Sequence, residues 1–296
     1  MQRRDFIKAT ITSSAALSVA TTPAARSQPA DRLVAGARAA ISGVDTNVSL
    51  FHWPFRRLPL DETGALLKKM SEHGITAAWA GSFEGILHRD IAGVNQRLAD
   101  SCRQSNGRLV PFGSINLALP DWEDDLRRCH ETHHMPGVRL HPNYHGYTLA
   151  DPRFKRCLQI ATERGLLVQI ALLLEDTRTQ HPLMVVPDVD VAPLAEIAAT
   201  VPKVSVLLLN GGKVLEGTHA ARLAATPGIH FDIARVETAG GVGRHLRKLP
   251  AGRLVFGTHA PFFIYESAVI KLQESALTAA ETRALLDDNP RQLLRA

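Results

Sequence analysis

The feature that most constrains the fold is a regular alternation of short apolar runs with longer amphipathic stretches, from residue 43 to the C-terminus. Several of the runs are apolar at nearly every position, which is typical of parallel strands buried on both faces. Eight such units without a linker between them predict a single-domain α/β fold, a closed (β/α)8 barrel (TIM barrel). The predicted strands are GVDTNVSL, ITAAWAG, RLVPFGSIN, GVRLHP, LLVQIALL, VSVLLLN, GIHFDIAR and RLVFGTHAP.

An open, doubly wound sheet is the alternative arrangement of the same units. The dinucleotide-binding form of that sheet needs a glycine-rich turn between its first strand and helix. No Gly-x-Gly-x-x-Gly motif follows any of the predicted strands. The closed barrel is therefore the preferred prediction.

The N-terminus resembles an export signal. Arg3 and Arg4 are followed in register by Phe6 and Lys8, and then by a mildly apolar stretch rich in Ala, Ser and Thr. This pattern is typical of a twin-arginine signal peptide, although a basic, amphipathic first helix of the fold is the alternative. The predicted organisation is a signal peptide at 1–26, a linker at 27–42 and the barrel at 43–296.

A signal of this kind predicts a periplasmic protein whose partner during export is the twin-arginine machinery. The apolar part of the leader is short and is interrupted by Ser and Thr. It therefore falls short of the roughly 20 apolar residues that a membrane-spanning helix needs. We expect a protein without a membrane span.

Charge and cysteine content exclude further classes of protein. The chain holds 34 basic and 29 acidic residues, a formal charge of +5, and the leader alone contributes four basic residues against one acidic residue. The remaining surplus forms no basic stripe, so nucleic acid is not an expected partner. None of the three cysteines lies in a CxxC pair or in metal-ligand spacing, which argues against a disulfide framework.

In a (β/α)8 barrel the chemistry lies at the C-terminal ends of the strands and in the loops that follow them. These ends therefore supply the candidate functional residues. In chain order they are Asn47 and Ser49 with His52 beyond, Gly81, Asn116, Arg139 and His141, Gln169 and Ala171, Asn210, Asp232 and Arg235, and His259.

Five phrases at or near these strand ends are similar to the amidohydrolase-related family of metal-dependent barrel hydrolases and decarboxylases. Together they extend the resemblance over residues 43–294. The resemblance implies a small-molecule substrate and a site at the barrel mouth. The phrases are GVRLHPNYHGYTLADPRF, ERGLLVQIA, LLLNGGK, RLVFGTHAPF and LLDDNPRQLL.

The chain departs from that family at the positions that the resemblance assigns to metal ligands. The family carries two histidines on strand one, one each on strands five and six, and an aspartate on strand eight. In this chain the corresponding positions are Asn47, Ser49, Ala171, Asn210 and His259. None keeps the ligand of the family, so we expect no cofactor.

A metal site with new ligands is the alternative to a site without metal. His141, His181 and His259 with Glu175 supply imidazole and carboxylate groups of the kind that bind zinc or manganese. Metal analysis of protein purified from cells would separate the two hypotheses.

Without a metal, a barrel mouth needs a polarising cation and a base. Arg139 is predicted to act as a clamp for a carboxylate or an oxyanion. His141 shares its strand face, and His141 or His259 is predicted to activate water. The expected function is hydrolysis of a small carbonyl compound such as a lactone, an ester or a similar carboxylate-bearing molecule. The structural alternative is a buried Arg139–His141 pair with an acidic neighbour.

Other polar residues near the strand ends are predicted to bind the substrate. The amides of this set are equally typical of structural hydrogen bonding, and the loop residues are equally typical of a solvated loop or a packed lid. The predicted set is Asn47, Gln169, Asn210, Tyr144, Glu175, Asp176, Arg178, His181 and His52.

Two functional alternatives use the same residues. One is a catalytically silent periplasmic barrel that binds a small acid, and the other is a metal-dependent hydrolase or decarboxylase with non-standard ligands. A base close to both a water molecule and an oxyanion donor in one pocket would favour catalysis over binding.

Replacing both Arg3 and Arg4 with Lys should leave the protein unprocessed and in the cytoplasm. The reason is that the export machinery reads the pair of guanidinium groups. Immunoblots of periplasmic and cytoplasmic fractions measure the outcome. Normal periplasmic accumulation of the double variant would refute the signal assignment.

Overall fold

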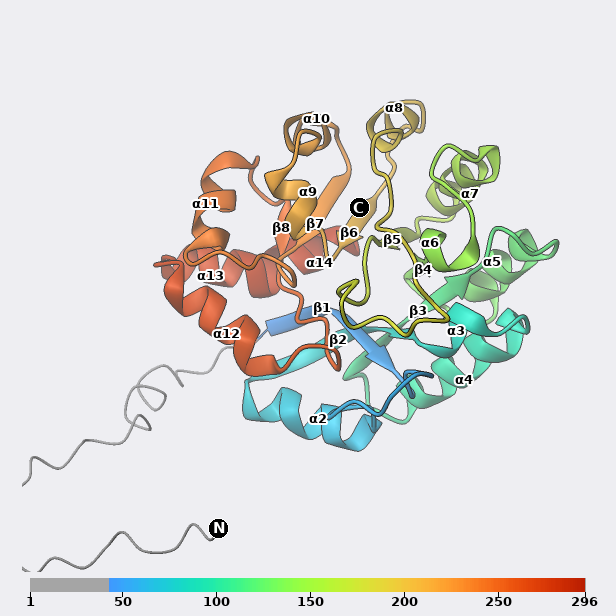
Figure 1. Ribbon diagram of the computed structural model, residues 1–296, viewed down its shortest axis with the longest axis horizontal. Coiled ribbons are helices and arrows are strands. Elements are labelled where there is room, and N and C mark those ends of the chain that lie inside the picture. The colour runs from blue at the N-terminus through green and yellow to red at the C-terminus, as the bar shows by residue number, and fades with distance from the viewer. Residues whose placement is uncertain (1–42, 296) are drawn as a thin grey trace, which may run out of the picture. The chain divides into compact units, whose positions relative to one another are not determined.

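The computed structural model describes residues 43–295, so the predicted signal peptide and the whole of the predicted linker lie outside the described residues. Eight parallel strands follow one another around a single sheet in the order β1 to β8. Figure 1 shows them surrounded by helices. The strands are β1 Gly43–Leu50, β2 Ile75–Ser82, β3 Leu109–Ile115, β4 Gly137–Leu140, β5 Leu167–Ala171, β6 Val206–Leu209, β7 Ile229–Asp232 and β8 Leu254–Val255.

The ring closes between β1 and the chain that follows β8. Backbone hydrogen bonds of 2.9 Å run from Thr46 N to Phe256 O, from His259 N to Asn47 O and from Ser49 N to Ala260 O. The predicted (β/α)8 barrel is therefore confirmed. β8 itself is shorter than predicted, because residues 256–260 pair with β1 in an irregular conformation that includes a φ of 62° at His259.

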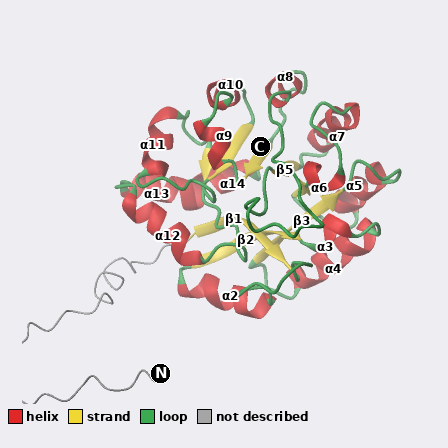
Figure 2. Ribbon diagram, in the orientation of Figure 1, coloured by secondary structure: helices red, strands yellow, loops and turns green. Residues whose placement is uncertain are grey.

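Helices and loops alternate with the strands around the barrel, as Figure 2 shows. None of the helices within residues 43–295 is long and apolar enough to cross a membrane. The helices are α2 Thr63–Glu72, α3 Glu84–Leu87, α4 Ile91–Arg103, α5 Trp122–Glu131, α6 Pro142–His145, α7 Pro152–Glu163, α8 Leu194–Ala199, α9 Gly212–Glu216, α10 Ala220–Ala225, α11 Gly241–Lys248, α12 Tyr265–Glu274, α13 Ala279–Arg283, the π-helix η1 Ala284–Asp288 and α14 Asn289–Leu293.

Local sequence explains why these helices begin and end where they do. The Asp151 side chain accepts a hydrogen bond from Arg153 N at the start of α7, and Pro152 occupies the first helical position. Gly165 lies just beyond the end of α7 with a φ of 64°. This arrangement is the usual asymmetry of helix caps, because proline needs no partner for its nitrogen and glycine tolerates the left-handed region.

Apolar side chains of the described residues form three clusters, of which one joins Trp53 and Phe83 in the segments that follow β1 and β2. The largest cluster packs the outer faces of the strands against the helices. A smaller cluster fills the barrel near the N-terminal ends of the strands, where Trp79 and Phe112 stack with their ring centroids 5.1 Å apart. The space above this smaller cluster, toward the C-terminal ends, is left to polar side chains.

Asp45 holds the closing seam from the outer side of β1. Its Oδ1 accepts hydrogen bonds from Thr258 N and Asn47 N, each at 3.0 Å. Its Oδ2 accepts from Thr258 Oγ1 at 2.6 Å and from Tyr265 Oη at 2.8 Å. Burial raises the pKa of this carboxyl, and the four hydrogen bonds oppose that rise. One carboxylate thus connects β1, the loop after β8 and α12.

Replacing Asp45 with Ala should destabilise the barrel by about 3–5 kcal/mol, since it leaves several buried donors without an acceptor. Tyr265→Phe removes only one of these donors together with its bond, so about 1 kcal/mol is expected. Urea unfolding of both variants measures the difference. Equal losses for the two variants would contradict the assignment of Asp45 as the shared acceptor.

Candidate functional site

Arg139 lies inside the barrel, just above the apolar cluster, and is almost completely buried. Its Nε donates to Gln169 Oε1 at 2.8 Å, and its Nη1 donates to Val48 O at 2.8 Å and to Ser49 Oγ at 3.2 Å. Its Nη2 donates to Trp79 O at 3.3 Å. The guanidinium group of β4 therefore binds strands β1, β2 and β5 from within.

The sequence makes room for this guanidinium group at Gly81 of β2. A Cβ atom at Gly81 would lie 2.6 Å from Nη1 of Arg139. Gln169 completes the layer, because its Nε2 donates to Thr46 O at 3.0 Å while its Oε1 accepts from Arg139. Gln169 and Ser49 thus both accept hydrogen bonds from Arg139.

The charge of Arg139 is not paired with a carboxylate among the described residues. The acidic neighbour expected from the loop after β5 is engaged elsewhere, because Glu175 pairs with Arg56 and Asp176 pairs with Arg178 at 2.9 Å. Burial lowers the pKa of Arg139 to about 10, and the charges of Asp232 and Asp45 oppose this. With its donors already used by the barrel wall, Arg139 is poorly placed to act as a substrate clamp.

A second polar group joins Asn47, Asn210 and Asp232 at the ends of β1, β6 and β7. Asn47 Nδ2 donates to Asn210 Oδ1 at 2.9 Å and to Asp232 Oδ2 at 2.6 Å. Asn210 N donates to Asp232 Oδ1 at 2.9 Å, and Asn210 Nδ2 donates to Leu173 O at 2.6 Å. Two residues that the resemblance places at metal-ligand positions are thus used to hold a carboxylate.

Asp232 is fully buried, and this burial raises its pKa to about 6 against the lowering effect of the hydrogen bonds from Asn47 and Asn210. A carboxyl group that titrates near neutrality suits general acid–base work. Sequence reasoning placed Asp232 at a strand end and gave it no role. Its position at the end of GIHFD was the available signal.

His259 lies beside this group in the loop after β8. Its Nε2 is 2.7 Å from Leu174 O, and since a carbonyl oxygen only accepts, Nε2 carries the proton and Nδ1 keeps a lone pair. Burial lowers the pKa of His259 to about 3. The imidazole is therefore neutral at physiological pH.

Arg235, which follows β7, is the second residue whose role the sequence did not reveal. Its side chain is 7% exposed, and its contact with a carboxylate among the described residues is with the exposed Glu237 at 3.5 Å. The guanidinium carbon lies 5.2 Å from the centre of the Phe263 ring, and the Lys271 ammonium lies 5.7 Å from the same ring. The His259 ring is 5.4 Å from Phe263, so these cations border the imidazole.

Three loops meet over the mouth, and they follow β1, β5 and β8. Arg56 of the first pairs with Glu175 of the second and lies 5.6 Å from the Phe262 ring of the third. Trp53 packs edge-on against Phe262, with ring centroids 5.1 Å apart. In Figure 1 the loop after β5 crosses the front of the ring of strands. The packed lid considered from the sequence is therefore present.

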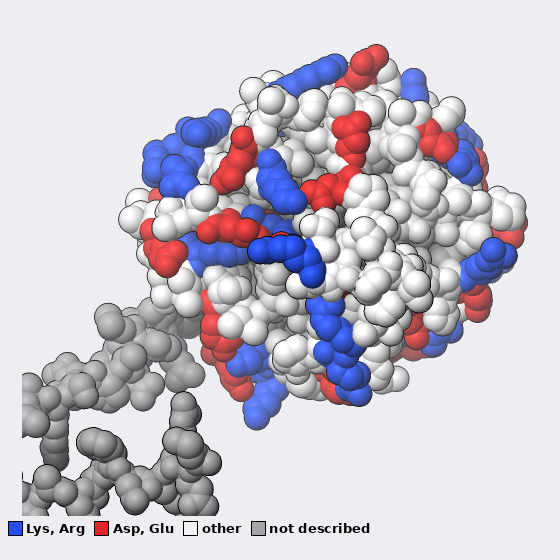
Figure 3. All heavy atoms as spheres, in the orientation of Figure 1, with Lys and Arg blue, Asp and Glu red and all other residues white. Residues whose placement is uncertain are grey.

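Several predicted substrate-binding residues lie on or under this lid. The Tyr144 ring faces Trp53 at 6.1 Å, and the Tyr144 hydroxyl is buried without a hydrogen-bond partner in the described part of the chain. His181 is exposed and stacks on Phe55 at 5.1 Å. Asp176 and Arg178 form an exposed pair at the rim. Figure 3 shows basic and acidic side chains interspersed over this face.

His141 is buried at the start of α6, and its Nδ1 has no hydrogen-bond partner within residues 43–295. Burial, followed by the charges of His145 and Arg139, lowers its pKa well below the usual value. The His141 and His145 rings are 5.9 Å apart. His141 is thus a neutral imidazole near the mouth, as His259 is.

The donor set at the mouth does not fit a metal centre of three or four good ligands. Between residues 43 and 295, one group of at least three His, Cys, Asp or Glu side chains brings its ligand atoms within 4.8 Å of one another, and it consists of His52, Asp61 and Glu62. The proposed set of His141, His181, His259 and Glu175 does not converge in this way. At the mouth, Asn47, Asn210 and the Asp232 carboxylate form hydrogen bonds with one another instead.

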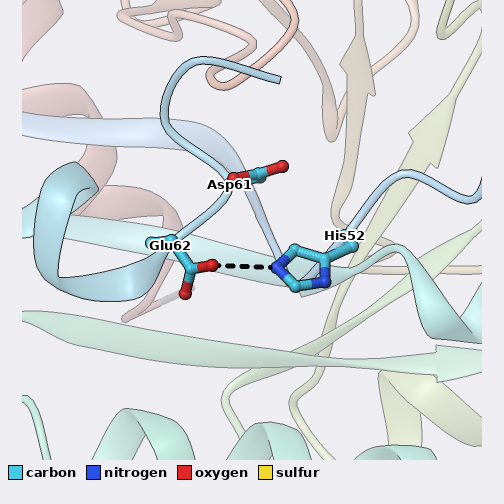
Figure 4. Close-up of side chains that lie close together, drawn as sticks. All are labelled: His52, Asp61 and Glu62. Carbon is cyan, nitrogen blue, oxygen red and sulfur yellow. Dashed lines mark hydrogen bonds and ion pairs between the residues drawn. The ribbon is translucent and has the colours of Figure 1, made fainter. Parts of the chain in front are cut away.

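The group of His52, Asp61 and Glu62 lies at the rim, and the Arg57 guanidinium group of the same chain already pairs with its two carboxylates. Figure 4 shows His52 and Glu62 pointing toward each other, 3.2 Å apart. Arg57 donates to both oxygens of Asp61, at 2.7 and 3.0 Å, and to Glu62 at 3.0 Å. These bonds lower the pKa of Asp61 to about 2. His52 therefore belongs to a surface ion-pair network.

The burial of Asp232 predicts a pH-dependent contribution to stability. Because its pKa is raised from 3.8 to about 6, the contribution is complete below about pH 4 and is lost as the pH rises through 6. Asp232→Asn removes this titration, so the variant should gain up to about 3 kcal/mol relative to the wild type between pH 4 and pH 7. Urea unfolding at several pH values measures the gain, and a difference that is independent of pH would contradict the burial effect.

Solved structures share this architecture. 2,6-Dihydroxybenzoate decarboxylase from Rhizobium is 15% identical, with a TM-score of 0.64 over 85% of this chain and 99% of that chain. 5-Carboxyvanillate decarboxylase from Sphingomonas paucimobilis is 11% identical, with a TM-score of 0.67 over 86% and 99%. The 5-carboxyvanillate decarboxylase from Novosphingobium aromaticivorans, complexed with manganese and 4-hydroxy-3-methoxy-5-nitrobenzoic acid, is 13% identical, with a TM-score of 0.67 over 86% and 96%. At these identities the similarity establishes the fold.

None of the curated proteins compared with this chain matches it significantly. A family model described as Amidohydrolase matches residues 46–296, which include nearly the whole barrel. The match begins within β1, one residue before Asn47, and runs to the end of the chain. The family resemblance expected from the sequence is thereby confirmed, and the chain belongs to the amidohydrolase family.

Proposed function

We propose that this protein is an enzyme that hydrolyses a small carbonyl compound carrying a carboxylate, such as a lactone or an ester, without the usual metal centre of its family. The observation that carries the proposal is Arg235. A guanidinium group with so little exposure and only a loose ion pair to Glu237 suits the binding of an anion. It borders the buried His259 imidazole through the Phe263 ring, which both side chains contact.

Arg235 replaces Arg139 as the clamp in this proposal. The donors of Arg139 are used by the barrel wall, whereas those of Arg235 make no hydrogen bond to another described residue. Lys271 shares the Phe263 ring with Arg235 and adds a second positive charge. We assign Arg139 the structural role of holding the strand ends in register.

Asp232 is the proposed base. In its ionised form it would take a proton from water as the water oxygen attacks the carbonyl carbon, and it would return that proton to the alcohol oxygen when the carbon–oxygen bond breaks. Asn47 and Asn210 orient the carboxylate. The lone pair on His259 Nδ1 would accept a hydrogen bond from the same water, and His141 is the alternative imidazole for this task.

Decarboxylation is the second candidate. It is favoured by the solved structures, because their names describe decarboxylases of 2,6-dihydroxybenzoate and 5-carboxyvanillate, which are carboxylates. One of them is complexed with manganese, so this candidate includes a metal-dependent reaction with non-standard ligands. We further propose export to the periplasm, on the strength of Arg3, Arg4, Phe6 and Lys8 in the leader.

A panel of lactones, esters and aromatic acids that carry a carboxylate, assayed with and without chelator, tests the proposal. Hydrolysis that is unaffected by chelator is the expected result. Arg235→Gln and Asp232→Asn should each lower kcat/KM on the order of a hundredfold, since lost transition-state contacts of this kind cost about 2–4 kcal/mol. Arg222→Gln, which changes an exposed arginine of α10 outside the predicted site, should have little effect.

Each contrary outcome identifies another function. Release of carbon dioxide instead of hydrolysis would support the decarboxylase. Activity that vanishes in chelator and returns with zinc or manganese would support a metal site. Saturable binding of an acid without turnover would show a silent binding barrel.

A further inference from the structure

The polar groups at the barrel mouth are closed off from solvent. Asp232 is 0% exposed, His259 is 1% exposed and His141 is 2% exposed. The loops that follow β1, β5 and β8 meet over these groups, and a small molecule cannot reach side chains that are buried to this degree. The proposed function places a substrate at the mouth, so on that function at least one of the three loops must move.

The loop after β5 has the construction of a body that moves as a unit. Residues 173–188 contain no helix or strand, and the ends of this loop are joined, because Val189 N donates to Leu172 O at 3.1 Å. Inside the loop, Gln180 Oε1 accepts from Val186 N at 3.0 Å, and Gln180 Nε2 donates to Val186 O at 3.2 Å. Compact loops of roughly 6–16 residues with close ends and internal contacts are Ω-loops, which are frequently functional.

The first two residues of this loop are anchored to the barrel. Leu173 O accepts a hydrogen bond from Asn210 Nδ2 at 2.6 Å, and Leu174 O accepts one from His259 Nε2 at 2.7 Å. Both donors belong to side chains that are buried at the strand ends. The part of the loop that is free to move therefore begins at Glu175.

Glu175 also carries the main contact between the moving part and another loop. Its side chain is almost completely buried, and within residues 43–295 its one ion pair is with Arg56 of the loop after β1. Arg56 is half-exposed and lies over the Phe262 ring of the loop after β8, which in turn stacks on His259 with ring centroids 5.0 Å apart. The ion pair thus joins all three loops above the imidazole.

Other contacts of the moving part with the barrel lie at the surface. Asn143 Nδ2 donates to Pro187 O at 3.1 Å, and Lys213 pairs with Asp188 at 2.9 Å, both in exposed positions. Exposed ion pairs contribute little to stability, whereas removing the partner of a buried carboxylate is costly. Opening of the loop is therefore opposed chiefly by the ion pair of Glu175.

We propose that residues 175–188 form a lid that opens and closes as one body, with the Arg56–Glu175 ion pair as its latch. Opening separates the loop after β5 from the loops after β1 and β8, and it admits water and substrate to His259. The competing explanation is that the three loops form a permanent cap. This proposal rests on the site of the proposed function, but its test needs no substrate.

Modification by diethyl pyrocarbonate, followed by peptide mass spectrometry, tests the proposal on the full-length protein. The reagent acylates the free nitrogen of a neutral imidazole, which in His259 is Nδ1. His259 should react in the wild type at a rate set by opening of the lid. His245, which is 5% exposed and lies in α11 outside the mouth, reports global unfolding and should react more slowly.

Arg56→Gln should increase the rate of His259 modification about tenfold, because it leaves a buried carboxylate without its cation in the closed form only. Arg57→Gln is the matched control. Arg57 is an exposed arginine of the same loop, and its partners Asp61 and Glu62 precede α2, so the rate should be unchanged.

Hydrogen exchange in Arg56→Gln tests whether the lid moves as one body. The Val186 amide should keep its protection, because Gln180 holds it from within the loop. Faster exchange at Val186 would show unfolding of the loop and would contradict movement as a unit.

A reversible cross-link supplies a second, independent test. The rings of Phe55 and His181 stack with centroids 5.1 Å apart, so cysteines at these two positions join the loop after β1 to the lid. A reducible bis-methanethiosulfonate bridge between Phe55→Cys and His181→Cys should protect His259, and reduction should restore its modification. The native cysteines are buried and do not compete for the reagent.

Three results would overturn the proposal. They are equal modification of His259 in the bridged and reduced forms, equal modification in the wild type and Arg56→Gln, and modification of His245 as fast as that of His259. A lid that opens in a protein that turns over no compound of the substrate panel would refute the proposed function and leave the lid established.

Discussion

The positive charge of Arg139, buried among the strands, constrains the rest of this structure. A guanidinium group cannot be buried without acceptors for its donors, and the Arg139 side chain finds them on neutral oxygens of β1, β2 and β5. The barrel must supply these oxygens at fixed positions. The register of four strands around the interior is therefore tied to one side chain, and Gly81 is required beside it.

The layer formed by Arg139 also fixes the positions of the candidate functional groups above it. Arg139 holds Val48 O and Ser49 Oγ, and Asn47 is the adjacent residue of β1. Asn47 in turn binds Asp232 and Asn210 across the mouth. A rigid lower layer of this kind keeps the Asp232 carboxyl group oriented, as its proposed acid–base role requires.

The eight-unit architecture could be predicted because apolar runs and helix caps are local signals. The strand ends were located for the same reason, and Asn47, Asn210 and His259 lie at the mouth as expected. The role proposed for Asp232 could not be predicted, because it depends on a partner far away in the sequence. The Asp232 carboxyl group accepts a hydrogen bond from Asn47, which lies 185 residues earlier in the sequence. Any residue type has a backbone oxygen, so the sequence does not reveal which of them accept hydrogen bonds from Arg139.

The lid could be foreseen only as one of two alternatives. Aromatic and charged residues after strand one are compatible with either a ligand site or a packed cover, and composition does not separate them. The structure resolves the question through contacts between three loops, in which Arg56 meets Glu175 and Phe262. Such contacts arise from tertiary proximity, which a single sequence does not encode in any local pattern.

The seam between β1 and residues 256–260 has a consequence for the order of events during folding. The hydrogen bond from Thr46 Oγ1 to Phe256 O joins residues 210 positions apart, and loop-closure entropy makes such contacts slow to form. The segment that completes the ring also carries His259. In the proposed function, His259 therefore reaches the other site residues only after a contact between distant parts of the chain has formed.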